Sequence, residues 1–305
     1  MGAYVFRRIL QTILVAFAAV IVIFVLVRLS GDPAALIAGP SATQEDVEQI
    51  RHQLGFDKPM AVQLADYLRQ AAKGDLGESI RYQEPAVQVS VERIPATLEL
   101  TGAAMALSLL VAIPAGIISA TRRNSLIDRV TMVFAVVGQT MPVFWLGIIL
   151  IVVFAVQLHW LPTGGRGTPQ QLIMPAITLA LFNMARIARL VRSEMLDVIG
   201  NEYIQVARSK GLSERLVILR HALRNAAIPV VTIIGLQVGQ LLGGAVVTET
   251  VFAWPGVGRL MVDAIHYRDY PIIQTVVLMM AITVAVINLL VDLSYAWLDP
   301  RVRYS

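Results

Sequence analysis

The sequence contains no cysteine, which excludes disulfide bridges, thiolate metal sites and cysteine nucleophiles. It also lacks the G-x-x-x-x-G-K-[ST] sequence that cradles nucleotide phosphates, so this chain has no such means of binding and hydrolysing ATP. Its histidines have no spacing typical of a metal site. We therefore predict no catalytic residue, metal ion or cofactor in this chain. The four histidines are His52, His159, His221 and His266.

Charge is scarce: 15% of residues are Asp, Glu, Lys or Arg, against about 25% in soluble domains. Six windows of at least 19 residues contain no charge at all. About 20 apolar helical residues cross a bilayer, so the windows predict six transmembrane helices. A soluble enzyme or a nucleic-acid-binding module is excluded, despite a pI of 9.6. The windows are Ile9–Val27, Leu100–Thr121, Val130–Gly165, Gly167–Ala185, Asn225–Thr248 and Tyr270–Val291.

The windows are continuous rather than alternating, which favours helices over the strands of a membrane barrel. We expect an all-α integral membrane protein with one transmembrane domain over residues 1–305. The first window is too long for a signal peptide and lacks a cleavage site, so it is predicted to stay as a span. Pro142 predicts a kink in the third window.

The distribution of cations predicts that both termini lie in the cytoplasm. This topology places 15 Lys and Arg residues inside and 3 in short outer loops. Residues 30–98 then form an acidic extracytoplasmic subdomain. Thr43 with Asp46 predicts a helix start, Gly55 a stop, and a second helix is expected from Pro59 to Lys73. This subdomain either packs on the ends of the spans or docks a soluble partner.

The long cytoplasmic loop, residues 193–228, predicts two short helices. The first has an apolar stripe of Tyr203, Val206 and Ala207 and ends at Gly211. The second starts after Ser213, and Pro229 is expected to open the fifth span. The leucines and alanine predicted on one face of the second helix are Leu216, Leu219, Leu223 and Ala226. An apolar helix face of this kind suits either the lipid headgroups or a protein partner.

Amides inside the windows are candidates for a polar pathway through the membrane. Gln237 and Gln240 share a helix face because they lie three residues apart. Hydrogen bonding between helices is the alternative role for each amide. The full set of candidates is Gln139, Asn183, Gln237, Gln240 and Asn288.

Short sequences in order along the whole chain resemble one family. They include Gly74–Ser79 (GDLGES), Pro142–Gly147 (PVFWLG), Ala207–Ser213 (ARSKGLS), Thr248–Gly258 (TETVFAWPGVG) and Leu298–Arg301 (LDPR). These short sequences identify the chain as similar to the membrane permeases of ABC importers, in the dipeptide, oligopeptide, glutathione and nickel branch.

The resemblance implies that the cytoplasmic loop carries a coupling helix, which docks on an ATPase subunit. The family motif E-A-A-x-x-x-G aligns its glycine with Gly211 and places Gln205, Val206 and Ala207 on the E-A-A positions, so the second alanine alone is matched. Arg224 stands where the general motif has proline. The residues implied in coupling are Glu202, Tyr203, Gln205, Val206, Ala207, Arg208, Lys210, Gly211 and Leu212.

The resemblance also implies the partners and the location. They are a second homologous permease, two ATPase subunits that carry ATP and Mg²⁺, and an extracytoplasmic substrate-binding protein, assembled in the inner membrane. The implied cargo is a small peptide, with nickel or another small solute as the alternative. A contact with the binding protein is implied at residues 30–98 and in the last outer loop, at Trp254, Pro255, Gly256 and Gly258.

Two other classes fit a six-helix chain. A rhomboid-type protease needs a serine and a histidine in the membrane, but no histidine lies in a span core and no G-x-S-x-G sequence occurs. An ion-coupled secondary transporter normally shows charges near the midplane and two related halves, and neither is visible here. Transport under an ion gradient without nucleotide would favour the latter class.

Overall fold

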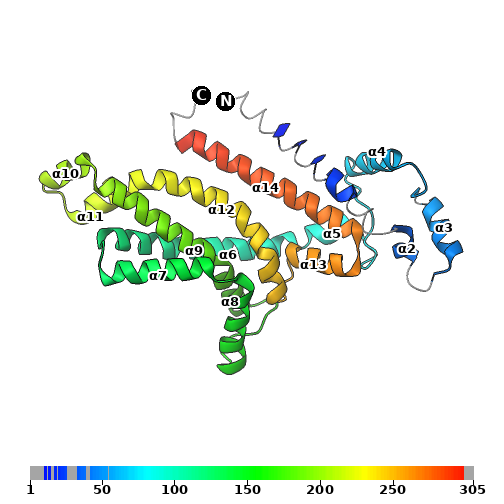
Figure 1. Ribbon diagram of the computed structural model, residues 1–305, viewed down its shortest axis with the longest axis horizontal. Coiled ribbons are helices and arrows are strands. Elements are labelled where there is room, and N and C mark those ends of the chain that lie inside the picture. Colours follow the sequence, from blue (N-terminus) through cyan, green and yellow to red (C-terminus); the bar gives the residue numbers. More distant parts are fainter. Residues whose placement is uncertain are drawn as a thin grey trace. The chain divides into compact units, whose positions relative to one another are not determined.

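The structure is a computed structural model whose described part is helical (Figure 1). It describes residues 10–11, 13–14, 17–18, 20–25, 33–38, 42–53 and 55–298. Across these ranges no strand is present beyond an isolated bridge between Glu78 and Pro85. The prediction of an all-α chain is confirmed for this part, whereas most of the first window and the Leu298–Arg301 motif beyond Leu298 lie outside it.

Four helices in the described part are long and apolar enough to cross a membrane. They contain most of the second, fourth, fifth and sixth windows. These helices are α6 (Ile94–Thr121), α9 (Pro169–Ile199), α12 (Leu223–Val251) and α14 (Tyr270–Leu298).

The third window contains a sharp turn rather than one straight helix. Helix α7 (Leu126–Thr140) is followed by α8 (Val143–Leu150) and the π-helix η1 (Ile151–Gln157), and the two segments meet at 105°. The kink expected at Pro142 is confirmed. It is this large because Met141, directly before the proline, is extended at ψ 125°, as residues before proline prefer. Counting the bent pair as one span gives five candidate spans among the described residues.

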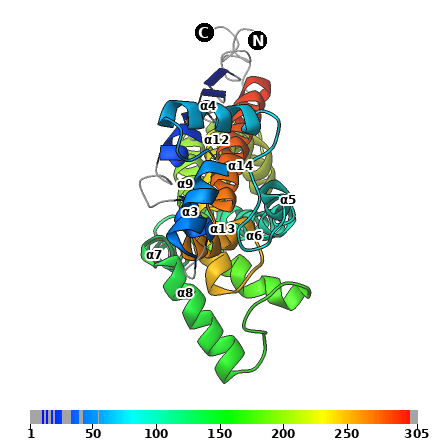
Figure 2. The ribbon, with the colours of Figure 1, turned by 90° about the vertical axis from the view of Figure 1, so that its right-hand side faces the viewer.

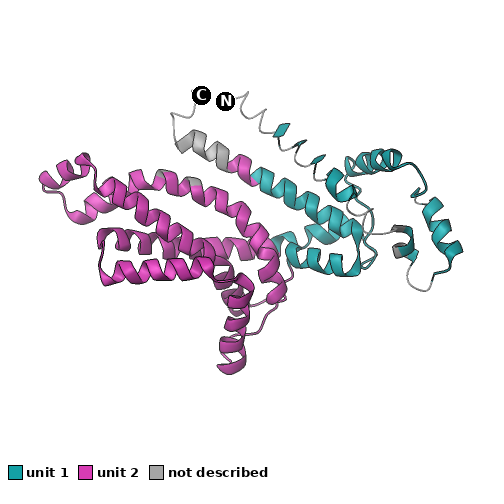
Figure 3. Cartoon of the chain, in the orientation of Figure 1, with its two compact units in different colours: residues 1–95, 256–286 teal, residues 96–255, 287–305 magenta. Residues whose placement is uncertain are grey.

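The chain divides into two compact units (Figure 3). Unit 1 comprises residues 1–95 and 256–286, and its described helices include α2 (Pro33–Ala38), α3 (Gln44–Gln53), α4 (Met60–Ala71), α5 (Ala86–Val91) and α13 (Val257–Tyr267). Buried Asp269 accepts hydrogen bonds from Ser79 Oγ and the Arg81 backbone N–H, and its Oδ1 accepts from Ile272 N at the start of α14. The GDLGES segment is thereby fixed to the turn before α14.

The helix starts and stops predicted near residues 43–74 are confirmed. Thr43 and Asp46 exchange hydrogen bonds at the start of α3, and these lower the pKa of Asp46. Gly55 and Gly74 follow α3 and α4 with φ of +70° and +82°, in the left-handed region that glycine favours.

Unit 2 comprises residues 96–255 and 287–305, and α9 lies at its centre, packed on α7 and α12. Gly116 of α6 also faces α9. A Cβ added there would lie 2.7 Å from the carbonyl oxygen of Ala188 and from Val191 Cβ. The absence of a side chain therefore allows α6 to approach α9 closely. In Figure 2, α8 projects away from this helix packing.

Candidate functional site

The segment between α9 and α12, which we call the α10 loop (residues 200–222), is fully structured. It contains α10 (Glu202–Ser209), the short α11 (Glu214–Leu216) and the π-helix η2 (Val217–Ala222), which runs directly into α12. The two predicted helices are present. The candidate membrane span begins at Pro229, as expected, and runs to Val251. The helix that contains it, α12, begins earlier, at Leu223, and continues through the proline. Buried Ala226 and Val230 pack in the core around this site and hold the helix together.

Helix α10 packs on the core through two of its side chains. Ile204 and Ala207 are buried and pack in the cluster that also contains Val217 of η2. Tyr203 and Val206 are 42% and 53% exposed. Of the predicted stripe, Tyr203 and Val206 are thus exposed and available to a partner, whereas Ala207 at its edge packs on the core beside Ile204.

A similar division occurs after Ser213. Leu216 and Leu219 are exposed, whereas Val217, Ile218 and Ala222 are buried. The predicted face of Leu216, Leu219, Leu223 and Ala226 was wrong for its first two residues, because the π-helical turn shifts the register of the faces.

An ion pair closes the turn between α10 and α11. Arg208 donates to both carboxylate oxygens of Glu214, from Nε at 3.1 Å and from Nη2 at 2.7 Å. This pairing lowers the pKa of Glu214. Gly211 lies inside the turn at φ +75°, and a Cβ placed there would meet nothing within 4 Å. The turn thus needs glycine for its backbone conformation rather than for space.

The outer surface of the α10 loop combines apolar and charged side chains. Tyr203, Val206 and Leu219 are exposed, and exposed Gln205, Lys210 and Arg215 lie among them in the sequence. Leu212 is half-buried against the core. Apolar side chains presented on a fixed helix are a typical protein-docking surface.

The candidate pathway amides do not all lie together. Asn183 on α9 and Gln237 on α12 are buried, Gln139 at the end of α7 is half-buried, and Gln240 and Asn288 are exposed. Gln240 accepts a hydrogen bond of 3.1 Å from Nη1 of Arg186 on α9. Sequence reasoning missed this arginine, because Arg186 was assigned to the cytoplasmic cations.

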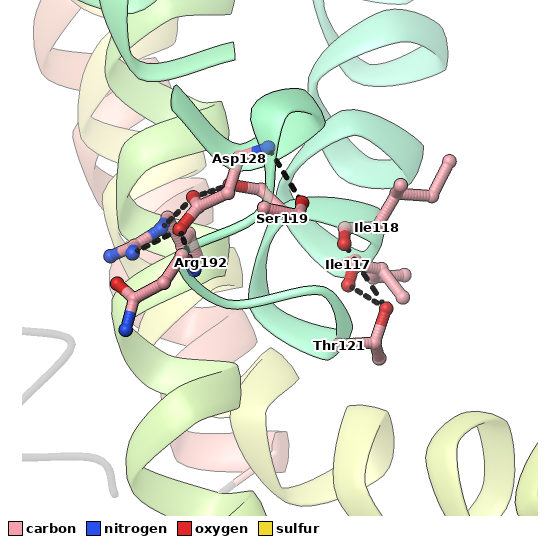
Figure 4. Close-up of polar contacts among 8 residues, drawn as sticks. Ile117, Ile118, Ser119, Thr121, Asp128 and Arg192 are labelled. Carbon is pink, nitrogen blue, oxygen red and sulfur yellow. Dashed lines mark hydrogen bonds and ion pairs between the residues drawn. The ribbon is translucent and has the colours of Figure 1, made fainter. Parts of the chain in front are cut away.

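A buried polar cluster joins three helices of unit 2 (Figure 4). Arg192 on α9 donates to both oxygens of Asp128 at the start of α7, and Asp128 also accepts from Ser119 on α6. Asp128 is 3% exposed. Sequence reasoning missed this cluster as well, since its members are up to 73 residues apart in the chain.

The residues predicted to touch a binding protein include a buried tryptophan. Trp254 is 1% exposed and its Nε1 donates to the carbonyl of Ala96 at 2.8 Å. Pro255 is half-buried, and Gly256 and Gly258 are buried. Across the described residues, no three His, Asp or Glu side chains are grouped so that they could hold a metal ion.

Helices of this length and apolar composition define a helical membrane protein. The chain belongs to the family of binding-protein-dependent transport system inner-membrane components. The model of that family matches residues 112–304, and the model of its N-terminal region matches residues 1–101. The chain is therefore an ABC importer permease of the inner membrane.

Two relatives match the chain along its whole length. It is 45% identical over 303 residues to the glutathione transport system permease protein GsiC of Escherichia coli K12, covering 99% of each chain. It is 42% identical to the probable peptide ABC transporter permease protein y4tP of Sinorhizobium fredii, covering 100% of each chain.

Solved transporters share the fold. A chain of the MetNI methionine ABC transporter, in inward-facing conformations, superposes with a TM-score of 0.59 at 19% identity, over 70% of this chain and 97% of that one. A chain of an amino acid ABC transporter with histidines gives a TM-score of 0.56 at 15% identity, over 68% and 94%. These likenesses concern the helical architecture alone.

Proposed function

We propose that this chain forms half of a translocation pathway for small peptides, of dipeptide to glutathione size. Support comes from two relatives, a glutathione permease and a probable peptide permease, which are 45% and 42% identical over essentially all of the chain. The other half is a second, homologous permease. The chain itself is not an enzyme.

In this proposal the chain crosses the membrane six times, with both termini inside. The bent pair α7–α8 with η1 counts as the third span, and residues 9–27 form the first. The excess of inside cations, 15 against 3, supports this orientation. The extracytoplasmic subdomain is then residues 30–98 and the coupling loop residues 193–228, within one domain over residues 1–305.

The observation that carries the ATP-driven part of the proposal is the exposed apolar surface of α10. Tyr203 and Val206 project from a helix that Ile204 and Ala207 fix to the core, so a movement of a docked protein is transmitted to α9 and α12. Two ATPase subunits, which hold ATP and Mg²⁺, dock one on each permease. The coupling residues are those of α10 and its turn, from Glu202 to Leu212.

A substrate-binding protein delivers the cargo from outside, in contact with residues 30–98 and the segment from Trp254 to Gly258. Because Trp254 is buried, its role there is to support the neighbouring backbone. ATP binding closes the ATPases, moves α10 and opens the pathway to the loaded binding protein. The amides at 139, 183, 237, 240 and 288 supply polar groups for a cargo that carries peptide bonds.

The test is reconstitution of the tagged chain with co-purified partners in vesicles. Uptake of radiolabelled glutathione or trialanine should require both ATP and the binding protein. Uptake that is driven by an ion gradient without nucleotide would instead indicate a secondary transporter. Failure of any ATP-hydrolysing subunit to co-purify in mild detergent would contradict the proposal directly.

A further inference from the structure

Arg186 places a permanent positive charge inside the long helix α9, directly after the charge-free window Gly167–Ala185. It lies 17 residues after the first residue of α9 and 13 before the last. At a rise of about 1.5 Å per residue it is at least about 20 Å from either end.

Within the described part of the chain, Arg186 donates its side-chain hydrogen bond to a neutral amide. Its Nη1 donates to Gln240 Oε1 at 3.1 Å. Two other arginines of unit 2, Arg192 and Arg208, each hold a carboxylate at 2.6–2.7 Å. Within the described residues no Asp or Glu forms an ion pair with Arg186, so the remaining guanidinium donors are available to an acid from elsewhere.

Two buried amides with unpaired polar atoms lie one turn away on the same helices. Asn183 is 4% exposed and its Oδ1 has no hydrogen bond, and Gln237 is 1% exposed with neither Oε1 nor Nε2 bonded. Asn183 precedes Arg186 by three residues and Gln237 precedes Gln240 by three, so each shares a helix face with a member of the bridge. Buried polar groups are nearly always satisfied, so unpaired ones indicate a missing ligand.

The surface beside the bridge is open. Gly243 lies three residues beyond Gln240 on α12, and a Cβ added there would meet nothing within 4 Å. One residue further, Gly244 faces Leu179 of α9. Helix α12 therefore packs on α9 at Gly244, whereas the space beside Gly243, one turn from Gln240, is open in this chain.

We propose that Arg186 and Gln240, flanked by Asn183 and Gln237, bind the carboxylate of the transported solute within the pathway. The guanidinium fork matches a carboxylate with two hydrogen bonds, and the Gln240 amide holds the fork in place. The flanking amides bind the peptide groups next to that carboxylate. This inference rests on the proposed peptide import and names the chemical group that the pathway recognises.

The test compares Arg186→Gln and Arg186→Lys with wild type in the complete reconstituted transporter. Uptake of radiolabelled trialanine and binding-protein-stimulated ATP hydrolysis are measured together. Arg186→Gln should lower uptake about tenfold while hydrolysis stays within about twofold, and Arg186→Lys should recover a third or more of the uptake. Arg123→Gln, at an exposed turn after α6, is the matched control and should change neither.

Three results would overturn the site. Unchanged uptake in Arg186→Gln would show that the charge has no role in transport. An equal fall of uptake and hydrolysis in both variants would show a structural role. A loss confined to vesicles with anionic phosphatidylglycerol, and absent from pure phosphatidylcholine, would show that Arg186 binds a lipid headgroup. If wild type itself takes up no peptide with ATP and binding protein, the proposed function fails before this site is in question.

Discussion

Arg192 holds both carboxylate oxygens of Asp128, at 2.6 and 2.8 Å, and so joins the start of α7 to the half of α9 that leads into the α10 loop. Ser119 adds α6 to the same cluster. A displacement of α10 that moves the end of α9 therefore also moves the turn between α6 and α7. The cluster thus ties the three helix ends to one another.

Asp128→Asn should destabilise the chain by about 3 kcal/mol, because it leaves the Arg192 guanidinium partly buried without a counter-charge. The measurement is thermal unfolding of the purified transporter in detergent. Asp197→Asn, at an exposed position on α9, is the control and should be near neutral. Equal melting temperatures for the two variants would mean that the cluster does not hold the helices together.

Gly116→Ala should destabilise the folded chain by roughly 1–3 kcal/mol, since the added methyl group would lie 2.7 Å from the backbone of α9. Gly102→Ala on the same helix has nothing within 4 Å of the new Cβ and should be neutral or slightly stabilising. Comparing the two unfolding curves separates helix packing from helix propensity. The packing account is wrong if both substitutions have the same sign.

Gly211→Ala should lower the stability of the folded α10 loop by about 1–2 kcal/mol. An alanine at φ +75° is strained, although the space around its Cβ is open. Gly211→Asn should cost less, as asparagine adopts left-handed conformations more readily. ATP-driven uptake should fall in the order wild type, Asn, Ala. An alanine variant with wild-type uptake would show that this turn is not needed for coupling.

Glu214→Gln should remove the ion pair with Arg208, which at this exposure contributes about 0.2–1 kcal/mol. The pKa of Glu214 is lowered in the folded state, so the pair stabilises above the pKa of the unfolded chain and is lost as pH falls through the folded value. The stability difference between wild type and variant should thus be constant near neutral pH and vanish in acid. A stability difference between wild type and variant that grows as the pH falls would contradict this role of the ion pair.

Local signals in the sequence predicted local structure well. The Thr43 and Asp46 cap, the glycine stops at 55 and 74, and the turn at Pro142 follow from neighbouring residues, and the structure confirms each. Charge-free windows likewise mark long helices, because bilayer thickness sets their length.

Features that depend on distant residues could not be predicted in this way. Tyr203 and Ala207 are both apolar, and only the position of η2 and α9 decides which one is buried. The bridges from Arg186 to Gln240 and from Arg192 to Asp128 span 54 and 64 residues. In the sequence alone those arginines resemble ordinary cytoplasmic cations, because their partners lie on other helices.

The most direct test of the account uses the absence of native cysteine. A single Val206→Cys, on the exposed face of α10, should crosslink to an ATPase subunit in the assembled transporter and remain inaccessible to a thiol reagent added outside intact cells. Val133→Cys, exposed on α7, is the control and should give no such crosslink. Labelling of residue 206 from outside, or no crosslink to any ATPase, would contradict the claim that this permease is driven through α10.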